Sequence, residues 1–264
     1  GFTGIGIGSA MNGLRPIIEF MTFNFSLVAM DQIINGAAKI MQMSGGQFNL
    51  PIVFRGPTGN AGQLGAQHSQ NFENWFANTP GLKVVVPSNP YDAKGLLKSS
   101  IRDNDPVIFM ESELMYGDKG NVPEKEYLLP IGKSNVVKEG NQITLLSFGK
   151  MMKIANESYK EAKKLNVDVE LIDLRTVRPI DYEGIINSVK KTNRLVIIEE
   201  AWPLGSISSE ISHHIQRFAF DYLDAPIHRV TCADVPFHYS PTLIKEIVPS
   251  VEKTIEAIKK VMYK

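Results

Sequence analysis

The segment Leu50–Gln70, LPIVFRGPTGNAGQLGAQHSQ, predicts more about the fold than any other stretch of this chain. It opens with a continuous apolar run, Leu50–Phe54, which is typical of a strand buried on both faces of a parallel sheet. A loop with four glycines follows directly. Since glycine lets a backbone approach a ligand closely, and sites in open α/β sheets lie beyond the carboxyl ends of strands, this loop is a candidate site.

The loop ends in three polar residues, His68, Ser69 and Gln70. An imidazole at this position can transfer protons near neutral pH. The alternative interpretation is a glycine-rich connector in which Ser69 caps the next helix. Ser69 does not match a hydrolase nucleophile, because no G-x-S-x-G motif surrounds it.

Strand and helix signals alternate on both sides of this segment, which predicts an α/β fold with parallel sheets and crossover helices. Apolar runs predict strands at Arg15–Phe20, Leu50–Phe54, Leu82–Val86, Val107–Met110, Ile143–Ser147, Val169–Ile172 and Leu195–Ile198. Apolar residues at helical spacing predict helices at Phe25–Met43, Tyr91–Ile101, Met151–Leu165, Ser206–Phe218 and, at the C-terminus, residues 251–262.

The alternation stops at Gly117–Pro130, GDKGNVPEKEYLLP, which is rich in glycine, proline and charge and has no periodicity. We therefore expect two domains, at residues 1–116 and 134–264, joined by a linker at residues 117–133. The chain begins with Gly1 in a segment that reads as the inside of a domain. That start suggests that further sequence precedes it.

Composition excludes several classes of protein. The 264 residues carry 28 Lys and Arg against 28 Asp and Glu, which argues against nucleic-acid binding and against a polybasic membrane anchor. The single cysteine, Cys232, excludes an intrachain disulfide and a zinc site of several cysteines. No GxxxxGK[ST] motif is present, and the glycines of Gly4–Gly8 do not have the spacing of a dinucleotide fingerprint.

Three further clusters have a plain interpretation and a sharper one. The aromatic residues of EFMTFNF, at Phe20–Phe25, belong either to the core or to a platform for a flat heterocycle. The sequence Asp103–Pro106 is normally a turn but could offer oxygens to a hard cation. Glu199 and Glu200 read as a solvated or domain-contact pair at a strand end rather than as an acid/base dyad.

Taken together, several motifs resemble the β subunits of the pyruvate dehydrogenase E1 component, a transketolase-like family. The resemblance is collinear over the chain and rests on RPIIEFMTFNF, PIVFRGPTGNAGQLGAQHSQ, VIFMESELMYG, IDLRTVRPID and EEAWPLGS. The β subunits for branched-chain 2-oxo acids are close relatives, but the RGPTG, AQHSQ and ESELMYG stretches look more like the pyruvate enzymes. The resemblance implies a pyrimidine-binding domain followed by a transketolase C-terminal domain.

The resemblance also implies a function. The family forms an α2β2 assembly with E1 α subunits, decarboxylates pyruvate with thiamine diphosphate and transfers acetyl to the lipoyl group of the E2 dihydrolipoamide acetyltransferase. The GDG…N signature that holds Mg²⁺ and diphosphate is absent here, so the α subunit is expected to hold them. A family glutamate that activates the cofactor lies just upstream of the segment matching Gly1. The chain by itself is therefore expected to be inactive.

Residue by residue, the resemblance implies that Phe25 packs on the aminopyrimidine ring, with Met21 in the same wall, and that His68 handles the acyl group. It further implies a K⁺ site formed largely by backbone carbonyls of Ile52, Ser100, Ile101, Asp103 and Asp105. The family is cytoplasmic in bacteria and lies in the mitochondrial matrix or the plastid in eukaryotes. An E1 β subunit for branched-chain 2-oxo acids or acetoin, and a non-catalytic assembly subunit, are the alternatives.

Overall fold

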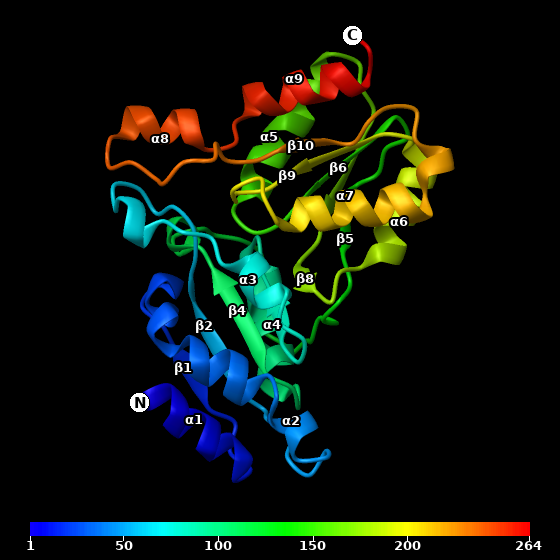
Figure 1. Ribbon diagram of the computed structural model, residues 1–264. Coiled ribbons are helices and arrows are strands. Elements are labelled where there is room, and N and C mark those ends of the chain that lie inside the picture. The colour runs from blue at the N-terminus through cyan, green and yellow to red at the C-terminus, as the bar shows by residue number, and fades with distance from the viewer. The chain divides into compact units, whose positions relative to one another are not determined.

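The computed structural model describes residues 1–264, which divide into two compact units (Figure 1). The first unit contains residues 1–61, 67–132 and 176–179, and the second contains residues 62–66, 133–175 and 180–264. Each unit is built around a five-stranded sheet.

The first sheet has the strand order β1-β2-β4-β3-β8. Its first four strands run parallel, and β8 pairs antiparallel with β3 at one edge. The apolar runs of the sequence become buried strands because both faces of the sheet are covered. The strands are β1 (Ile17–Glu19), β2 (Val53–Pro57), β3 (Lys83–Val85), β4 (Val107–Glu111) and β8 (Thr176–Arg178).

The longest helix of the first unit, α4 (Pro90–Arg102), matches its prediction closely. Asn89 caps it by accepting a hydrogen bond from the backbone N–H of Asp92 at 2.9 Å, and Pro90 fits the first helical position. The other helical elements of this unit are shorter. They are α1 (Phe2–Met11), η1 (Phe23–Ala29), η2 (Gln32–Ala37), α2 (Ile40–Met43), η3 (Ala66–His68), α3 (Glu73–Ala77) and η4 (Glu113–Met115).

The continuous helix predicted for Phe25–Met43 is wrong, because the structure breaks it into a 3₁₀ turn, a π turn and one short α-helix. The hydroxyl of Ser26 donates a local hydrogen bond to the carbonyl of Phe23 at 2.6 Å. Such bonds compete with regular helix formation, and Asn35 and Gly36 are weak helix formers. The helical spacing of the apolar residues therefore signalled burial correctly at Ile33 and Ala37 but not at Val28, which is exposed, and it did not signal a regular helix.

The second sheet has the strand order β10-β9-β6-β7-β5, and all pairs are parallel except β5 with β7. The prediction of two parallel sheets is thus confirmed, with one antiparallel edge strand in each. The strands are β5 (Asn135–Lys138), β6 (Ile143–Ser147), β7 (Val169–Asp173), β9 (Leu195–Ile198) and β10 (His228–Val230).

Helices cover both faces of this sheet. One face packs against α5 and α9, which lie side by side (Figure 1) and share an apolar core with Ile143 and Leu145. Between those two residues, Thr144 points to the opposite face, where its hydroxyl lies 2.5 Å and 2.7 Å from the hydroxyls of Ser188 and Thr192 of α6. The helical elements are α5 (Met151–Lys164), α6 (Tyr182–Thr192), α7 (Ile207–Phe218), η5 (Phe220–Tyr222), α8 (Pro241–Ile247) and α9 (Val251–Val261).

The acidic pair after β9 is buried, so its interpretation as a solvated pair is wrong. Glu199 accepts hydrogen bonds from the backbone N–H groups of Ile207 and Ser208 at 3.0 Å and 2.7 Å. These are the first N–H groups of α7, which a helix cannot satisfy internally. Complete burial raises the pKa of Glu199. Glu200 forms a buried ion pair with Lys150 at 2.7 Å.

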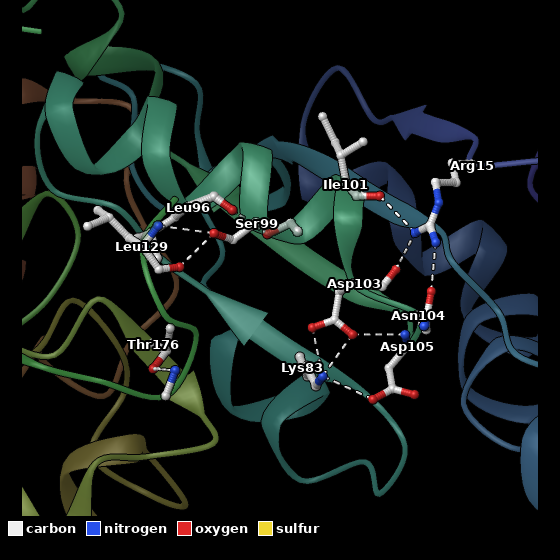
Figure 2. A network of polar contacts seen from close by, with 12 residues as sticks. Arg15, Lys83, Leu96, Ser99, Ile101, Asp103, Asn104, Asp105, Leu129 and Thr176 are labelled. Atoms are coloured by element: carbon white, nitrogen blue, oxygen red, sulfur yellow. Dashed lines mark hydrogen bonds and ion pairs between the residues drawn. The ribbon is translucent and has the colours of Figure 1, made fainter. Parts of the chain in front are cut away.

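Residues 117–133 form no helix or strand, yet part of this segment packs back on α4. The ring of Tyr127 stacks on Tyr91, with 4.5 Å between the ring centroids. The hydroxyl of Ser99 donates to the carbonyl of Leu129 at 2.6 Å (Figure 2). None of the helices combines the length and the apolar character that crossing a bilayer requires.

Candidate active site

The turn after β1 and the loop after β2 bring together two of the predicted site residues. Phe25 lies in the 3₁₀ turn η1, and His68 ends the short turn η3. Their rings meet edge to face, with 5.3 Å between the centroids and an angle of 85° between the planes. Both segments follow parallel strands at their carboxyl ends, which is where sites in such sheets are expected.

A small polar network fixes these two segments to each other. Thr22 caps η1, and its hydroxyl oxygen accepts a hydrogen bond from the side chain of Asn24 at 2.7 Å. The side-chain oxygen of Asn24 accepts hydrogen bonds from the backbone N–H and the side-chain amide of Gln70 at 3.2 Å and 3.3 Å. Because Asn24 is buried, these bonds hold His68 and Phe25 in a defined relation. Sequence reasoning missed Asn24; its place between two phenylalanines was the only signal.

The end of β2 also holds the end of β1 in place. The carbonyl of Arg55 accepts a hydrogen bond from the N–H of Phe20 at 2.8 Å. At Gly56 a Cβ atom would lie only 2.2 Å from the carbonyl oxygen of Phe20, so only glycine fits. The guanidinium of Arg55 forms two hydrogen bonds with Glu111 of β4, both at 2.6 Å, which raise the pKa of Arg55 despite its partial burial. The segment that leads into Met21 is therefore held by its neighbouring strand.

The exposed surface of Phe25 and Met21 fits the pyrimidine half of thiamine diphosphate. Phe25 is 40% exposed and Met21 is 75% exposed, so both present apolar surface that a flat ring can cover. Next to His68, the hydroxyl of Ser69 is buried without a hydrogen-bond partner. An aromatic face, an imidazole and a hydroxyl without a hydrogen-bond partner suit an aminopyrimidine.

The five predicted cation ligands lie around the end of α4. The N–H of Leu50, two residues before Ile52, donates to the carbonyl of Asn104 at 3.1 Å. The carbonyls of Ile101 and Asp103 both accept hydrogen bonds from Nη1 of Arg15, at 3.1 Å and 2.8 Å (Figure 2). These two oxygens thus already converge on a positive group. The donor set of carbonyl oxygens at a helix C-terminus suits a large monovalent ion.

The carboxylates of the same turn are already paired. Nζ of Lys83 lies 2.8 Å and 2.7 Å from the two carboxylate oxygens of Asp103, and 3.0 Å from that of Asp105 (Figure 2). Partial burial acts against the charged form of Lys83, but its hydrogen bonds to Asp103 and Asp105 outweigh this and raise its pKa. The side chains of Asp103 and Asp105 therefore bind a lysine, which leaves backbone oxygens as cation ligands.

No group of three or more His, Cys, Asp or Glu side chains in the chain could hold a metal ion.

Two family descriptions match the chain in succession. Residues 1–119 match the transketolase pyrimidine binding domain, and residues 132–254 match the transketolase C-terminal domain. A solved structure described as "Split gene transketolase, inactive beta4 tetramer" has a TM-score of 0.82 at 19% identity and covers 98% of this chain and 80% of its own. This likeness shows the fold.

Closer relatives are found among curated proteins. The pyruvate dehydrogenase E1 component subunit beta of Rhizobium meliloti is 52% identical over all of this chain, which spans 58% of that relative's length. The subunit of the same name from Rickettsia felis is 48% identical, again over all of this chain, which spans 81% of its length. The mitochondrial subunit beta-1 of rice is 48% identical, and here the chain spans 72% of the relative. The chain therefore belongs to the family of pyruvate dehydrogenase E1 component β subunits.

Proposed function

We propose that this chain supplies the pyrimidine half of a thiamine diphosphate site in a pyruvate dehydrogenase E1. The assembled enzyme decarboxylates pyruvate and passes the acetyl group to the lipoyl group of an E2 dihydrolipoamide acetyltransferase, which yields acetyl-CoA in the whole complex. The observation that carries this proposal is the pairing of Phe25 with His68 at the carboxyl ends of β1 and β2. Membership of the family supports it independently.

Each residue of the site has a separate task in this proposal. The exposed faces of Phe25 and Met21 hold the aminopyrimidine ring by apolar contact. His68 hydrogen-bonds the acyl group. When one lipoyl sulfur binds the acyl carbon and the S–S bond breaks, His68 donates a proton to the other sulfur, which departs as a thiolate. Asn24 and Gln70 keep His68 beside Phe25. When bound, thiamine diphosphate supplies the electron sink for decarboxylation.

An E1 α subunit completes the site in an α2β2 assembly and holds Mg²⁺ and the diphosphate. Large apolar side chains around η1 and α1 support a partner here, since Val28 is 94%, Met21 75% and Ile5 72% exposed. Exposed apolar surface of this kind marks protein interfaces. We assign residues 1–116 to the pyrimidine-binding domain, 117–133 to the linker and 134–264 to the C-terminal domain. The compartment is the cytoplasm in a bacterium; the rice relative is named mitochondrial.

The identity of the 2-oxo acid can be tested with the full-length subunit assembled with its α partner. We expect kcat/KM for pyruvate to exceed that for branched-chain 2-oxo acids by at least about tenfold, the effect of one or two methylene groups in an apolar pocket. The measurement is acylation of lipoamide with pyruvate, 3-methyl-2-oxobutanoate and acetoin as competing substrates, because acetoin has no carboxylate to lose as CO₂. A preference for either of the other two would assign the chain to a neighbouring branch of the family.

The turn at the end of α4 is the proposed site of K⁺, held by the carbonyl oxygens of Ile52, Ser100, Ile101, Asp103 and Asp105. Carbonyl oxygens without a dedicated carboxylate suit K⁺ better than Mg²⁺, which requires compact octahedral geometry and keeps its water. The C-terminal end of the α4 dipole adds to the attraction of a cation.

A direct consequence is that K⁺ stabilises the protein more than Na⁺ does. At equal ionic strength, we expect a higher melting temperature in KCl than in NaCl, because a ligand that binds only the folded state raises its stability by mass action. Choline chloride serves as the control for general salt effects. Equal melting temperatures in KCl and NaCl would argue against the site.

A further inference from the structure

The positively charged side chain of Arg15 already binds to the turn at the end of α4. Nη1 of Arg15 donates to the carbonyls of Ile101 and Asp103, and Nη2 donates to the side-chain oxygen of Asn104 at 2.7 Å (Figure 2). Two of the five carbonyls proposed for K⁺ are therefore bound to a guanidinium. We propose that Arg15 and the monovalent cation compete for these two oxygens, so that Arg15 sets how tightly the cation binds. This inference rests on the proposed cation site.

The charges around the turn favour competition over joint occupancy. Arg15 and Lys83 contribute two positive charges, and the carboxylates of Asp103 and Asp105 contribute two negative charges, so the turn is formally neutral. A cation that joined Arg15 on the same two oxygens would give a net positive charge, and the two cations would repel each other at short range. If the guanidinium leaves as the cation enters, the turn stays neutral.

The remaining ligands explain why Arg15 is the group that leaves. The carbonyl of Ile52 accepts a hydrogen bond from the N–H of Val107 at 2.9 Å, and that of Ser100 accepts one from the N–H of Asp103 at 3.3 Å. These backbone bonds hold the oxygens in place and leave a second lone pair for a cation. Arg15, by contrast, is exposed, so its side chain can turn into water without any change in the fold.

The test is a K⁺ titration of melting temperature on three proteins: wild type, Arg15→Met and Arg102→Met, each full-length and assembled with the α subunit. Arg102 is the matched control because it lies in the last turn of α4, close to the proposed cation site. Its side chain binds the carbonyl of Lys98 and the side chain of Glu126 instead of the proposed ligands. Choline chloride keeps the ionic strength constant.

We expect the K⁺ concentration at half-maximal stabilisation to fall by about tenfold in Arg15→Met, because hydrogen bonds from a charged donor no longer oppose the ion. Arg102→Met should match the wild type. If Arg15→Met does not assemble, Arg15→Gln, which keeps a hydrogen-bond donor but has no charge, replaces it with the same expected direction.

Each other outcome has a distinct meaning. Equal K⁺ midpoints in all three proteins would overturn the competition and leave the cation site standing. Loss of the K⁺ effect in Arg15→Met alone would show that Arg15 helps to form the cation site. That result would also overturn the proposed competition. If neither wild type nor Arg15→Met responds to K⁺, the cation site and the competition both fail.

Discussion

Replacing His68 with alanine is expected to slow acetyl transfer to lipoamide by at least about 10²-fold, the lower end of the usual contribution of a general acid or base. The imidazole lies beside Phe25 at the carboxyl end of the sheet, where the proposed function places the acyl group and the departing sulfur. Because this contact forms mainly in the transition state, kcat should fall by more than KM rises. The measurement is steady-state transfer by the full-length subunit assembled with α.

The same variant should keep its fold, its α2β2 assembly and its affinity for thiamine diphosphate. His68 lies in a short turn and is only partly buried, so the main structural loss is one edge-to-face ring contact, worth about 0.5–1.5 kcal/mol. His238→Ala is a suitable control, because His238 is exposed and lies in the second unit. Acetyl transfer at the wild-type rate would show that His68 is structural and that the loop is only a connector.

Local patterns were sufficient to predict the parallel strands except β10, although β2 begins three residues later than the apolar run that predicted it. Runs such as Leu50–Phe54 and Leu195–Ile198 are apolar at every position, and only a strand covered on both faces can bury all of them. The helix α4 was equally clear from the regular apolar spacing of Tyr91–Ile101, and the structure adds a capping asparagine and a proline at its start.

The two antiparallel edge strands could not be predicted in the same way. The strand β8 has only three residues, and it joins the first sheet by pairing Val84 with Arg178 and Val85 with Thr176, across about ninety positions of sequence. A short strand is specified by the partner that it meets and not by its own residues. The broken segment after Phe25 has a related cause, because side chains such as Ser26 bond to nearby backbone.

The site shows the same division between local and distant information. The loop residues around His68 stand out in the sequence by their composition. The contact of His68 with Phe25, however, depends on the adjacency of β1 and β2 and on the hydrogen bonds between Asn24 and Gln70. The guanidinium of Arg15 at the α4 turn lies 88 positions from Asp103 in sequence, and no local pattern signals that contact.

In the proposed function, this chain forms only one half of a catalytic site. The chain offers an aromatic wall and an imidazole but carries no GDG…N signature for Mg²⁺ and diphosphate. Decarboxylation needs the reacting group held in a fixed geometry, and binding one end of the cofactor alone does not provide that. We therefore expect complete dependence on a second subunit, which is the largest effect predicted for this protein.

The most direct test is CO₂ release from pyruvate in the presence of Mg²⁺ and thiamine diphosphate. The assay compares the full-length β subunit alone, the E1 α subunit alone and the two combined. We predict that neither subunit alone releases CO₂ above the uncatalysed rate and that the mixture turns over. Sustained CO₂ release by the β subunit without any α subunit would contradict the two-subunit site.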